Sequence, residues 1–273
     1  MAASVGAQRP SVISPPYRIR VTRLYEWPRV VESAALRLLE AALNGEREHP
    51  AAPRTAAELA AAARACVDEG ARAVHLHPWS GGVQTLEAGP CAEALRAVRE
   101  ACPSALVSLS TSSAIEPDPE RRRALVAGWT ELPDLVSANQ GEDGIVALCE
   151  DLLARGVGIE AGLLSVPDAE AFVESGLVER CAWALVEPLD AQPEAAERHA
   201  AEIESVLAGA GVTLPQIHHG DGVASWAVSE RGLARGHGIR TGLEDTTVLP
   251  DGRPARDNAE LVRAAAALMD GAA

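Results

Sequence analysis

Two histidines end a short apolar run of the chain, Ala73-Val74-His75-Leu76-His77. Residues two positions apart in an extended strand lie about 6.6 Å from each other and point to the same face. Both imidazoles can therefore reach one metal ion beyond the end of the strand, as histidines do in catalytic zinc sites. A half-buried strand with two histidines on its polar face has the same spacing, so the rest of the sequence has to separate these two interpretations.

Charged residues near the C-terminal end of the chain offer the other parts of a metal-dependent site. A catalytic zinc ion has three protein ligands and one open position, and Glu244 is the best candidate for the third ligand. Arg240 precedes Glu244 by four residues and can orient Asp245, or bind a carboxylate or an enolate oxygen. Alternatively, Glu244 lies near the N-terminus of a following segment, and Arg240 forms an ordinary salt bridge.

Polar side chains follow the other apolar runs as well. The Ser110-Thr111-Ser112-Ser113 run can donate hydroxyl and backbone N–H groups to a carboxylate, or it can cap the next turn. Adjacent residues of a strand face opposite ways, so only one of His218 and His219 can point toward a shared site. Further polar residues at the ends of apolar runs are Asn44, Glu46, Asn139, Glu160, Glu187 and Asp221.

Buried carboxylates need partners, because an unpaired charge is costly to bury. Glu160 and Glu187 should therefore pair with arginine or bind a cationic group of a substrate. Together with Glu46, they favour a substrate whose distal group is cationic or neutral.

These residues need a scaffold that brings distant segments together, and strand and helix patterns alternate eight times along the chain. A (β/α)8 barrel needs eight such units, and it gathers the C-terminal ends of all its strands around one site. A doubly wound open sheet is the alternative, but Asn44-Gly45 follows the first strand in place of a GxGxxG turn. The strands are predicted over residues 36–43, 70–78, 105–110, 135–139, 157–163, 182–187, 214–218 and 239–242, and the helices over 59–69, 87–101, 119–129, 144–155, 167–175, 193–207, 222–235 and 258–269.

The composition suits this fold class and narrows the partners. Hydrophobic residues make up 47% of the chain and aromatic residues only 3%, which is typical of aliphatic parallel strands covered by helices. A net charge of −15 argues against nucleic acid and against an anionic membrane surface. No apolar run is long enough to span a membrane, and five cysteines without a CxxC motif indicate reduced thiols in a cytoplasmic protein. Residues 1–34 are expected to form a poorly structured or loosely docked extension, and 35–273 the single catalytic domain.

Lysine is absent, because all 24 basic residues are arginines. Schiff-base catalysis, a P-loop lysine and a carbamylated lysine that bridges metals are therefore excluded. An enolate formed by this chain would have to be stabilised by a metal ion, by arginine or by backbone donors. A base that arginine orients should stay ionised at neutral pH without a raised pKa.

Several of these segments together resemble the β-keto acid cleavage enzyme family, whose namesake activity is the cleavage of 3-keto-5-aminohexanoate. The resemblance runs from about residue 36 to about residue 270. It rests on Leu43-Asn-Gly-Glu46, the HLH motif ending at His77, Ser110-Thr111, Ile239-Arg-Thr-Gly-Leu-Glu-Asp245 and Asn258-Ala-Glu-Leu-Val262.

The resemblance implies a zinc-dependent (β/α)8 barrel that condenses a β-keto acid with acetyl-CoA and splits the adduct into acetoacetate and a new acyl-CoA. The resemblance also implies a homo-oligomer, either a tetramer or a dimer. The zinc ligands implied are His75, His77 and Glu244, and the base is Asp245, arranged with Arg240. Substrate-binding residues would be Ser110 and Thr111 for the carboxylate and Glu46 for the distal group, with Asn139 as a further candidate.

Two departures from the family pattern affect the expected substrate more than the metal. Pro78-Trp79-Ser80 follows the histidine pair where many members have arginine and aspartate, and Ser112-Ser113 replaces a frequent glycine pair. Two other functions remain open. A metal-dependent hydrolase of the amidohydrolase type also uses HxH, although on its first strand and usually with a lysine or further histidines. A barrel that has lost turnover is the other alternative.

Overall fold

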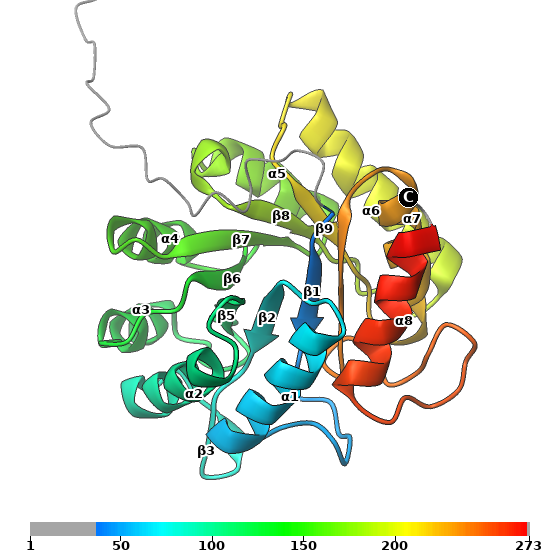
Figure 1. Cartoon of the computed structure of the whole chain (residues 1–273). Coiled ribbons are helices and arrows are strands. Elements are labelled where there is room, and N and C mark those ends of the chain that lie inside the picture. The colour runs from blue at the N-terminus through cyan, green and yellow to red at the C-terminus, as the bar shows by residue number, and fades with distance from the viewer. Residues whose placement is uncertain (1–36, 272–273) are drawn as a thin grey trace, which may run out of the picture. The chain divides into compact units, whose positions relative to one another are not determined.

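The computed structural model describes residues 37–271, and these residues form a closed barrel of eight parallel strands (Figure 1). The order around the barrel is β1-β10-β9-β8-β7-β6-β5-β2, so β1 lies between β2 and β10. The strands are β1 (Leu39–Ala42), β2 (Ala73–Leu76), β5 (Leu106–Ser110), β6 (Leu135–Asn139), β7 (Gly158–Leu163), β8 (Trp183–Val186), β9 (Gln216–His218) and β10 (Gly238–Thr241). The predicted (β/α)8 barrel is confirmed, whereas the predicted extension, residues 1–34, lies outside the described residues.

Helices surround the strands and alternate with them along the chain (Figure 1). N-capping residues in the sequence determine where several of these helices begin. Thr55 and Glu58 form a reciprocal capping box at the first helix, and the Asp118 carboxylate accepts the Arg121 N–H at the third. The helices are α1 (Ala56–Asp68), α2 (Ala88–Ala101), α3 (Pro119–Ala127), α4 (Ile145–Ala154), α5 (Val166–Glu174), α6 (Pro193–Gly209), α7 (Ser225–Ala234) and α8 (Asn258–Gly271).

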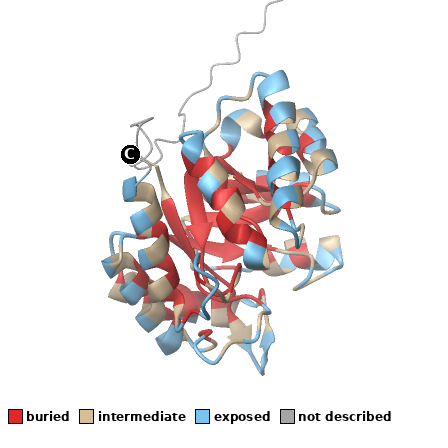
Figure 2. Ribbon diagram, turned by 90° about the vertical axis from the view of Figure 1, so that its right-hand side faces the viewer, coloured by how far each residue is buried: buried red, intermediate tan, exposed pale blue. Residues whose placement is uncertain are grey.

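The strands are buried on both faces, as the red ribbons of Figure 2 show. Val74 and Leu76 of β2 belong to the hydrophobic core that the helices cover, and so do Val107 and Leu109 of β5. The alternate residues point to the barrel interior, because strand side chains alternate between faces. Many of these interior residues are polar, and they are buried as completely as the aliphatic ones: Glu40, His75, Ser108, Glu160 and Arg240.

The structure differs from the predicted elements mainly at one short insertion. A two-stranded antiparallel hairpin of β3 (Trp79–Ser80) and β4 (Val83–Gln84) follows β2, between the strand predicted over 70–78 and the helix predicted over 87–101. The hairpin turns at Gly81 and Gly82, both at positive φ. β2 itself ends at Leu76, so His77 lies just beyond the strand. The other boundaries agree with the prediction to within a few residues.

Two further findings concern membranes and cysteines. Within residues 37–271, no helix is long and apolar enough to cross a bilayer. All five cysteines are buried and free. Burial raises the pKa of the Cys91 and Cys149 thiols to about 12, so neither is an activated nucleophile.

Candidate metal centre and active site

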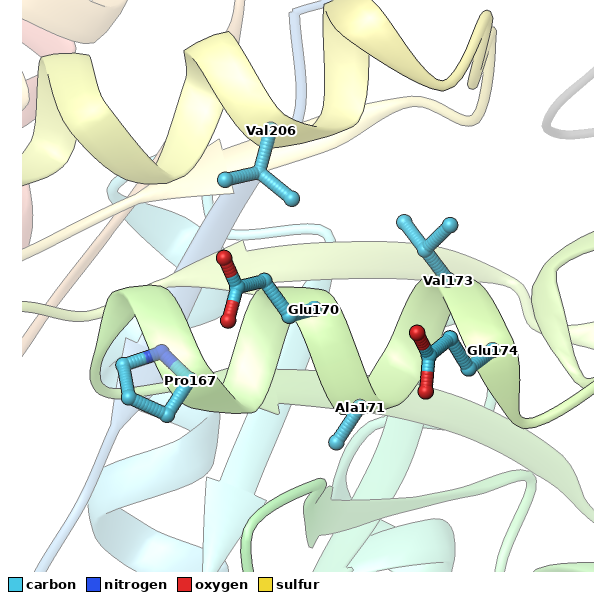
Figure 3. A pocket seen from close by; sticks show the side chains of 6 residues that line it. All are labelled: Pro167, Glu170, Ala171, Val173, Glu174 and Val206. Carbon is cyan, nitrogen blue, oxygen red and sulfur yellow. The ribbon is translucent and has the colours of Figure 1, made fainter.

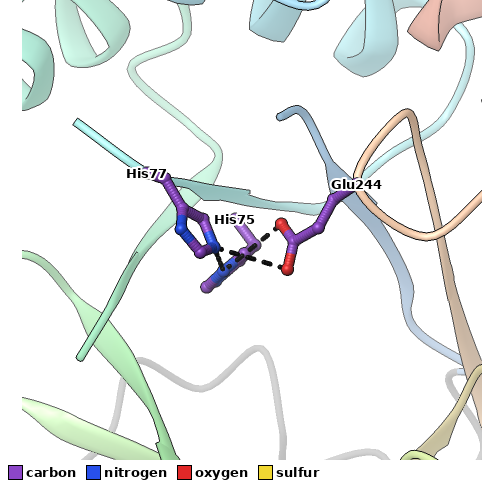
Figure 4. Close-up of side chains that lie close together, drawn as sticks. All are labelled: His75, His77 and Glu244. Atoms are coloured by element: carbon purple, nitrogen blue, oxygen red, sulfur yellow. Dashed lines mark hydrogen bonds and ion pairs between the residues drawn. The ribbon is translucent and has the colours of Figure 1, made fainter. Parts of the chain in front are cut away.

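His75, His77 and Glu244 meet at the C-terminal end of the barrel (Figure 4). The two imidazole Nε2 atoms lie 3.2 Å apart. The Glu244 carboxylate lies 3.6 Å from His75 Nε2 and 3.4 Å from His77 Nε2. The structure therefore brings together residues that are far apart in the sequence.

Neighbouring strands position these three side chains. β1 pairs with β2 on one side and with β10 on the other, so the end of β1 lies between the histidines and Glu244. Asn44, which follows β1, accepts the His77 backbone N–H and donates to the His77 carbonyl, both at 2.9 Å. This clamp holds His77 where the strand ladder has already ended.

Two glycines allow the segment that carries Glu244 to approach β1. A Cβ atom at Gly242 would lie 1.9 Å from the carbonyl oxygen of Ala42, and a Cβ atom at Gly45 would lie 2.8 Å from the Glu244 side chain. Gly45 also has a φ of +129°, which disfavours any other residue. The Gly in the Thr-Gly-Leu-Glu segment is therefore a steric requirement of the site.

The geometry of these three residues fits a tetrahedral zinc ion. Zinc bonds of about 2.0–2.1 Å separate tetrahedral ligand atoms by about 3.3–3.4 Å, close to the distances above. Burial lowers the pKa of His75 to about 3, so this imidazole is neutral, as a ligand must be. Glu244 Oε2 is buried without a hydrogen-bond partner. Burial alone would raise the pKa of Glu244, but the charge of the Arg240 guanidinium, the largest opposing influence, holds it well below its usual range.

The other ring nitrogen of each histidine is held by a neighbour. His75 Nδ1 lies 3.2 Å from Ser108 Oγ, and Ser108 in turn donates to Glu160. His77 Nδ1 bonds to the Gln84 carboxamide on the hairpin. If each Nδ1 carries the hydrogen of these bonds, both Nε2 lone pairs face each other, and a cation between them relieves that repulsion. Sequence reasoning missed Ser108 and Gln84.

Arg240 and Asp245 lie beside this group. Arg240 Nη2 donates to Asp245 Oδ1 at 2.7 Å and to Glu244 Oε1 at 2.9 Å, and Arg240 Nε donates to Asp245 Oδ2 at 3.2 Å. Burial raises the pKa of Asp245 despite the opposing charge of Arg240. The sequence predicted that the pKa of the base would not be raised. That prediction is wrong, because Asp245 is only 3% exposed and its burial disfavours the charged form.

His219 completes the buried polar cluster, and it is the member of the His218–His219 pair that points toward the site. Its Nδ1 lies 3.6 Å from Asp245 Oδ1, and its Nε2 lies 3.4 Å from Glu187 Oε2. Glu187 thus pairs with histidine and not with arginine as its nearest partner. Glu160 pairs with Ser108 and lies near Glu40, inside the barrel and fully buried. Burial, and then the neighbouring Glu160, raise the pKa of Glu40 well above its usual value.

The predicted substrate-binding residues occupy different environments. The Thr111 hydroxyl donates to the Ser137 carbonyl at 2.7 Å, and Ser110 Oγ accepts the Ser112 N–H at 3.3 Å. Asn139 donates to Glu142 at 3.0 Å. Glu46 is exposed, next to the loop that carries Asn44. Their roles toward a substrate remain predictions.

Trp79 contributes to the shape of the region through a cation–π contact. The Arg54 guanidinium lies 3.8 Å from the centre of the Trp79 ring. Arg54 also donates to the carbonyl oxygens of Gly45 and Arg47, so it joins the hairpin to the loop after β1.

A second cluster of metal-binding residue types lies on the outside of the barrel. Glu204 of α6, His218 of β9 and His237 offer ligand atoms within 4.8 Å of one another. The two imidazoles are stacked, with centroids 4.8 Å apart and an angle of 2° between their planes. Parallel rings cannot both aim an in-plane lone pair at one ion, and Arg231 and Arg235 already bind the carboxylate. This cluster is therefore a buried ion-pair network that joins α6 to α7.

We expect this network to make the fold sensitive to acid. Burial alone would raise the pKa of Glu204, but bonds from His237 and Arg231 lower it to about 2 from an ordinary value of 4.5. A depressed carboxyl pKa stabilises the fold above the unfolded value and loses this effect as the pH falls through the folded one. The free energy of unfolding should therefore fall by about 3 kcal/mol between about pH 4.5 and about pH 2. Denaturant unfolding of the parent and of Glu204→Gln measures it.

The Glu204→Gln variant is the matched control for that prediction. In this variant, the free energy of unfolding should no longer fall with pH through the titration of Glu204. The fall that His218 causes should remain, because burial lowers the pKa of His218 to about 3. Equal slopes for the two proteins below about pH 4.5 would contradict the assignment.

The outer surface also carries a groove between α5 and α6 (Figure 3). It has a volume of about 560 Å³ and is lined by Pro167, Glu170, Ala171, Val173, Glu174 and Val206. None of these lining residues belongs to the metal centre. We therefore assign the chemistry to the end of the barrel and not to this groove.

Comparison with known proteins identifies a family model that matches this chain and solved structures with a similar barrel. A family model described as beta-keto acid cleavage enzyme matches residues 38–203 and 168–273. Structures of ObcA in a ternary complex with a C4-CoA adduct and oxalate, and in a binary complex with oxaloacetate, each have a TM-score of 0.60 and 17% identity over 78% of this chain and 62% of the solved chain. Apo ObcA has a TM-score of 0.57, 18% identity, and coverage of 78% and 61%.

The structural matches show the barrel fold, and the chain spans about three fifths of the length of these solved relatives. The family model extends over nearly all of the described residues. It includes every strand and helix that carries the cluster around His75, His77 and Glu244. The chain belongs to the beta-keto acid cleavage enzyme family.

Proposed function

We propose that this protein cleaves a β-keto acid with acetyl-CoA as co-substrate, giving acetoacetate and a new acyl-CoA, and that it depends on zinc. The observation that carries the proposal is the convergence of His75, His77 and Glu244 next to the Arg240–Asp245 pair. Family membership supports the reaction class. The ObcA structures, which hold oxaloacetate or a C4-CoA adduct, support a keto acid and a CoA ester as partners.

Different residues of the chain would have different roles in such a reaction. His75, His77 and Glu244 would hold the metal, which supplies a Lewis acid for the oxygens of the keto acid and of an enolate. Asp245 removes the proton from the carbon next to the ketone. Arg240 holds the Asp245 carboxylate by two hydrogen bonds, which fixes the position of the base. Since lysine is absent, no covalent imine competes with this route.

We further propose that Ser110 and Thr111 contribute to binding of the substrate carboxylate, that Asn139 is a further substrate-binding residue, and that Glu46 lies near the distal group. The Thr111 hydroxyl and the Thr111 backbone N–H both donate to the Ser137 carbonyl, so a substrate carboxylate would have to replace one of these two bonds. The preference for a cationic or neutral distal group now depends on Glu46 alone. Glu160 is fully buried, and Glu187 faces His219.

The cellular setting and assembly are part of the same proposal. Five free buried cysteines support a reducing compartment such as the cytoplasm. A homodimer or homotetramer is proposed on the resemblance to the family.

The decisive experiment incubates the zinc-loaded protein with acetyl-CoA and a panel of β-keto acids that bear amino, carboxylate or alkyl tails. We expect acetoacetate and a new acyl-CoA to appear together in equal amounts. Product that forms without acetyl-CoA would instead indicate a hydrolase. A protein that binds no zinc and turns over no keto acid would be an inactive barrel, and the proposal would fail.

A further inference from the structure

A buried imidazole that the proposed chemistry does not use lies beside the base. His219 is 1% exposed, and both of its ring nitrogens face carboxylate oxygens, those of Asp245 and Glu187. Neither nitrogen has a hydrogen-bond partner among residues 37–271 at normal bonding distance. Unpartnered buried polar groups are rare in native structures and call for an explanation.

The fold fixes the direction in which this ring points. The His219 backbone N–H donates to the Val186 carbonyl of β8 at 3.1 Å. Its neighbour His218 points the other way, and the β-carbon of His218 packs against Gly232 of α7. Because side chains alternate along a strand, His219 is directed into the polar cluster.

Hydrogen bonding to the two oxygens of Asp245 is unequal. Oδ1 accepts from Arg240 Nη2 at 2.7 Å and also faces His219 Nδ1 at 3.6 Å, whereas the one donor to Oδ2 among residues 37–271 is Arg240 Nε at 3.2 Å. If His219 Nδ1 moves close enough to donate as well, Oδ1 would have two donors, which would oppose rotation of the carboxylate. Oδ2 is then the oxygen left to accept a proton.

We propose that His219, as the imidazolium that can donate from both ring nitrogens, is a positioning residue for Asp245 and that Glu187 holds the His219 ring in turn. This inference rests on the proposed function, since it takes Asp245 as the base. Glu187 lies at the outer end of the series, with 19% of its side chain exposed. The four residues Arg240, Asp245, His219 and Glu187 form one connected unit that fixes which oxygen of the base reacts.

The kinetic test uses the zinc-loaded enzyme with a β-keto acid and acetyl-CoA. For His219→Gln we expect kcat to fall roughly 10- to 100-fold, with KM within about threefold and zinc content unchanged. Glu187→Gln should lower kcat by a smaller factor. The double variant should have a kcat no lower than that of His219→Gln, because the two residues act as a unit. His199→Gln is the control: His199 of α6 pairs with Asp190, and the variant should keep the parent kcat.

A spectroscopic test is independent of turnover. Imidazole ¹⁵N shifts of His219 in the metal-free protein should change in Glu187→Gln, while those of His237 should not. A kcat for His219→Gln within about twofold of the parent, multiplied losses in the double variant, or unchanged His219 shifts would each overturn the proposal. If His219→Gln fails to fold, as judged by circular dichroism, the kcat and the His219 ¹⁵N shifts of Glu187→Gln test the proposal in its place. A parent enzyme without turnover would contradict the proposed function, and the ¹⁵N shifts would still test the contact.

Discussion

Asp245→Asn is expected to lower kcat on the order of a thousandfold while zinc stays bound. The substitution keeps the size of the side chain and can still accept a bond from Arg240, but it removes the group that takes the proton. General bases contribute roughly 10²- to 10⁴-fold to such reactions. Steady-state kinetics together with metal analysis of the same sample measure both parts of the expectation.

Asp221→Asn is the matched control for this variant. Asp221 lies at the same end of the barrel and pairs with Arg47, but its side chain is 47% exposed, and Asp245 is 3% exposed. We expect its kcat to stay within about threefold of the parent, because exposed ion pairs contribute little. Near-normal activity of Asp245→Asn would show that another group is the base.

His77→Ala is expected to abolish zinc binding at equilibrium. Two of the three ligands would remain, and the loss of one leaves a site that competes poorly with water and chelators. Equilibrium dialysis against a zinc chelator, followed by elemental analysis, measures the loss. Full occupancy in this variant would refute the ligand assignment.

The neighbours of His77 allow a graded version of that experiment. Gln84→Ala removes the bond to His77 Nδ1 and should weaken zinc binding roughly 10- to 100-fold, in keeping with the effect of other residues that orient metal ligands. His199→Ala removes an unrelated histidine and should leave zinc affinity unchanged.

The order of elements was predictable because its signals are local. The Thr55–Glu58 capping box and the Asp118 cap determine helix starts within a few residues of chain. The burial of the outward-facing strand residues under the helices follows from the aliphatic composition. The hairpin of Trp79–Gln84 was not predictable, because two strands of two residues are too short to show a period.

The site was predictable where residue types alone identify the chemistry, as with the histidine pair and Glu244. Its supporting residues depend on register, which a single sequence does not contain. Ser108 supports His75 because the two residues are direct partners in the pairing of β2 with β5. His219 could have been favoured over His218 by strand alternation only if the inward face of β9 had been known.

The position of β1 between β2 and β10 has a consequence for how the protein is made. The histidines belong to the second strand of the barrel and Glu244 to the segment after its last strand, so the ion would join the two ends of the sheet where they close on β1. A nascent chain on the ribosome could not hold this ion until its final βα unit had emerged. Zinc capture by all three ligands would then report completion of the barrel.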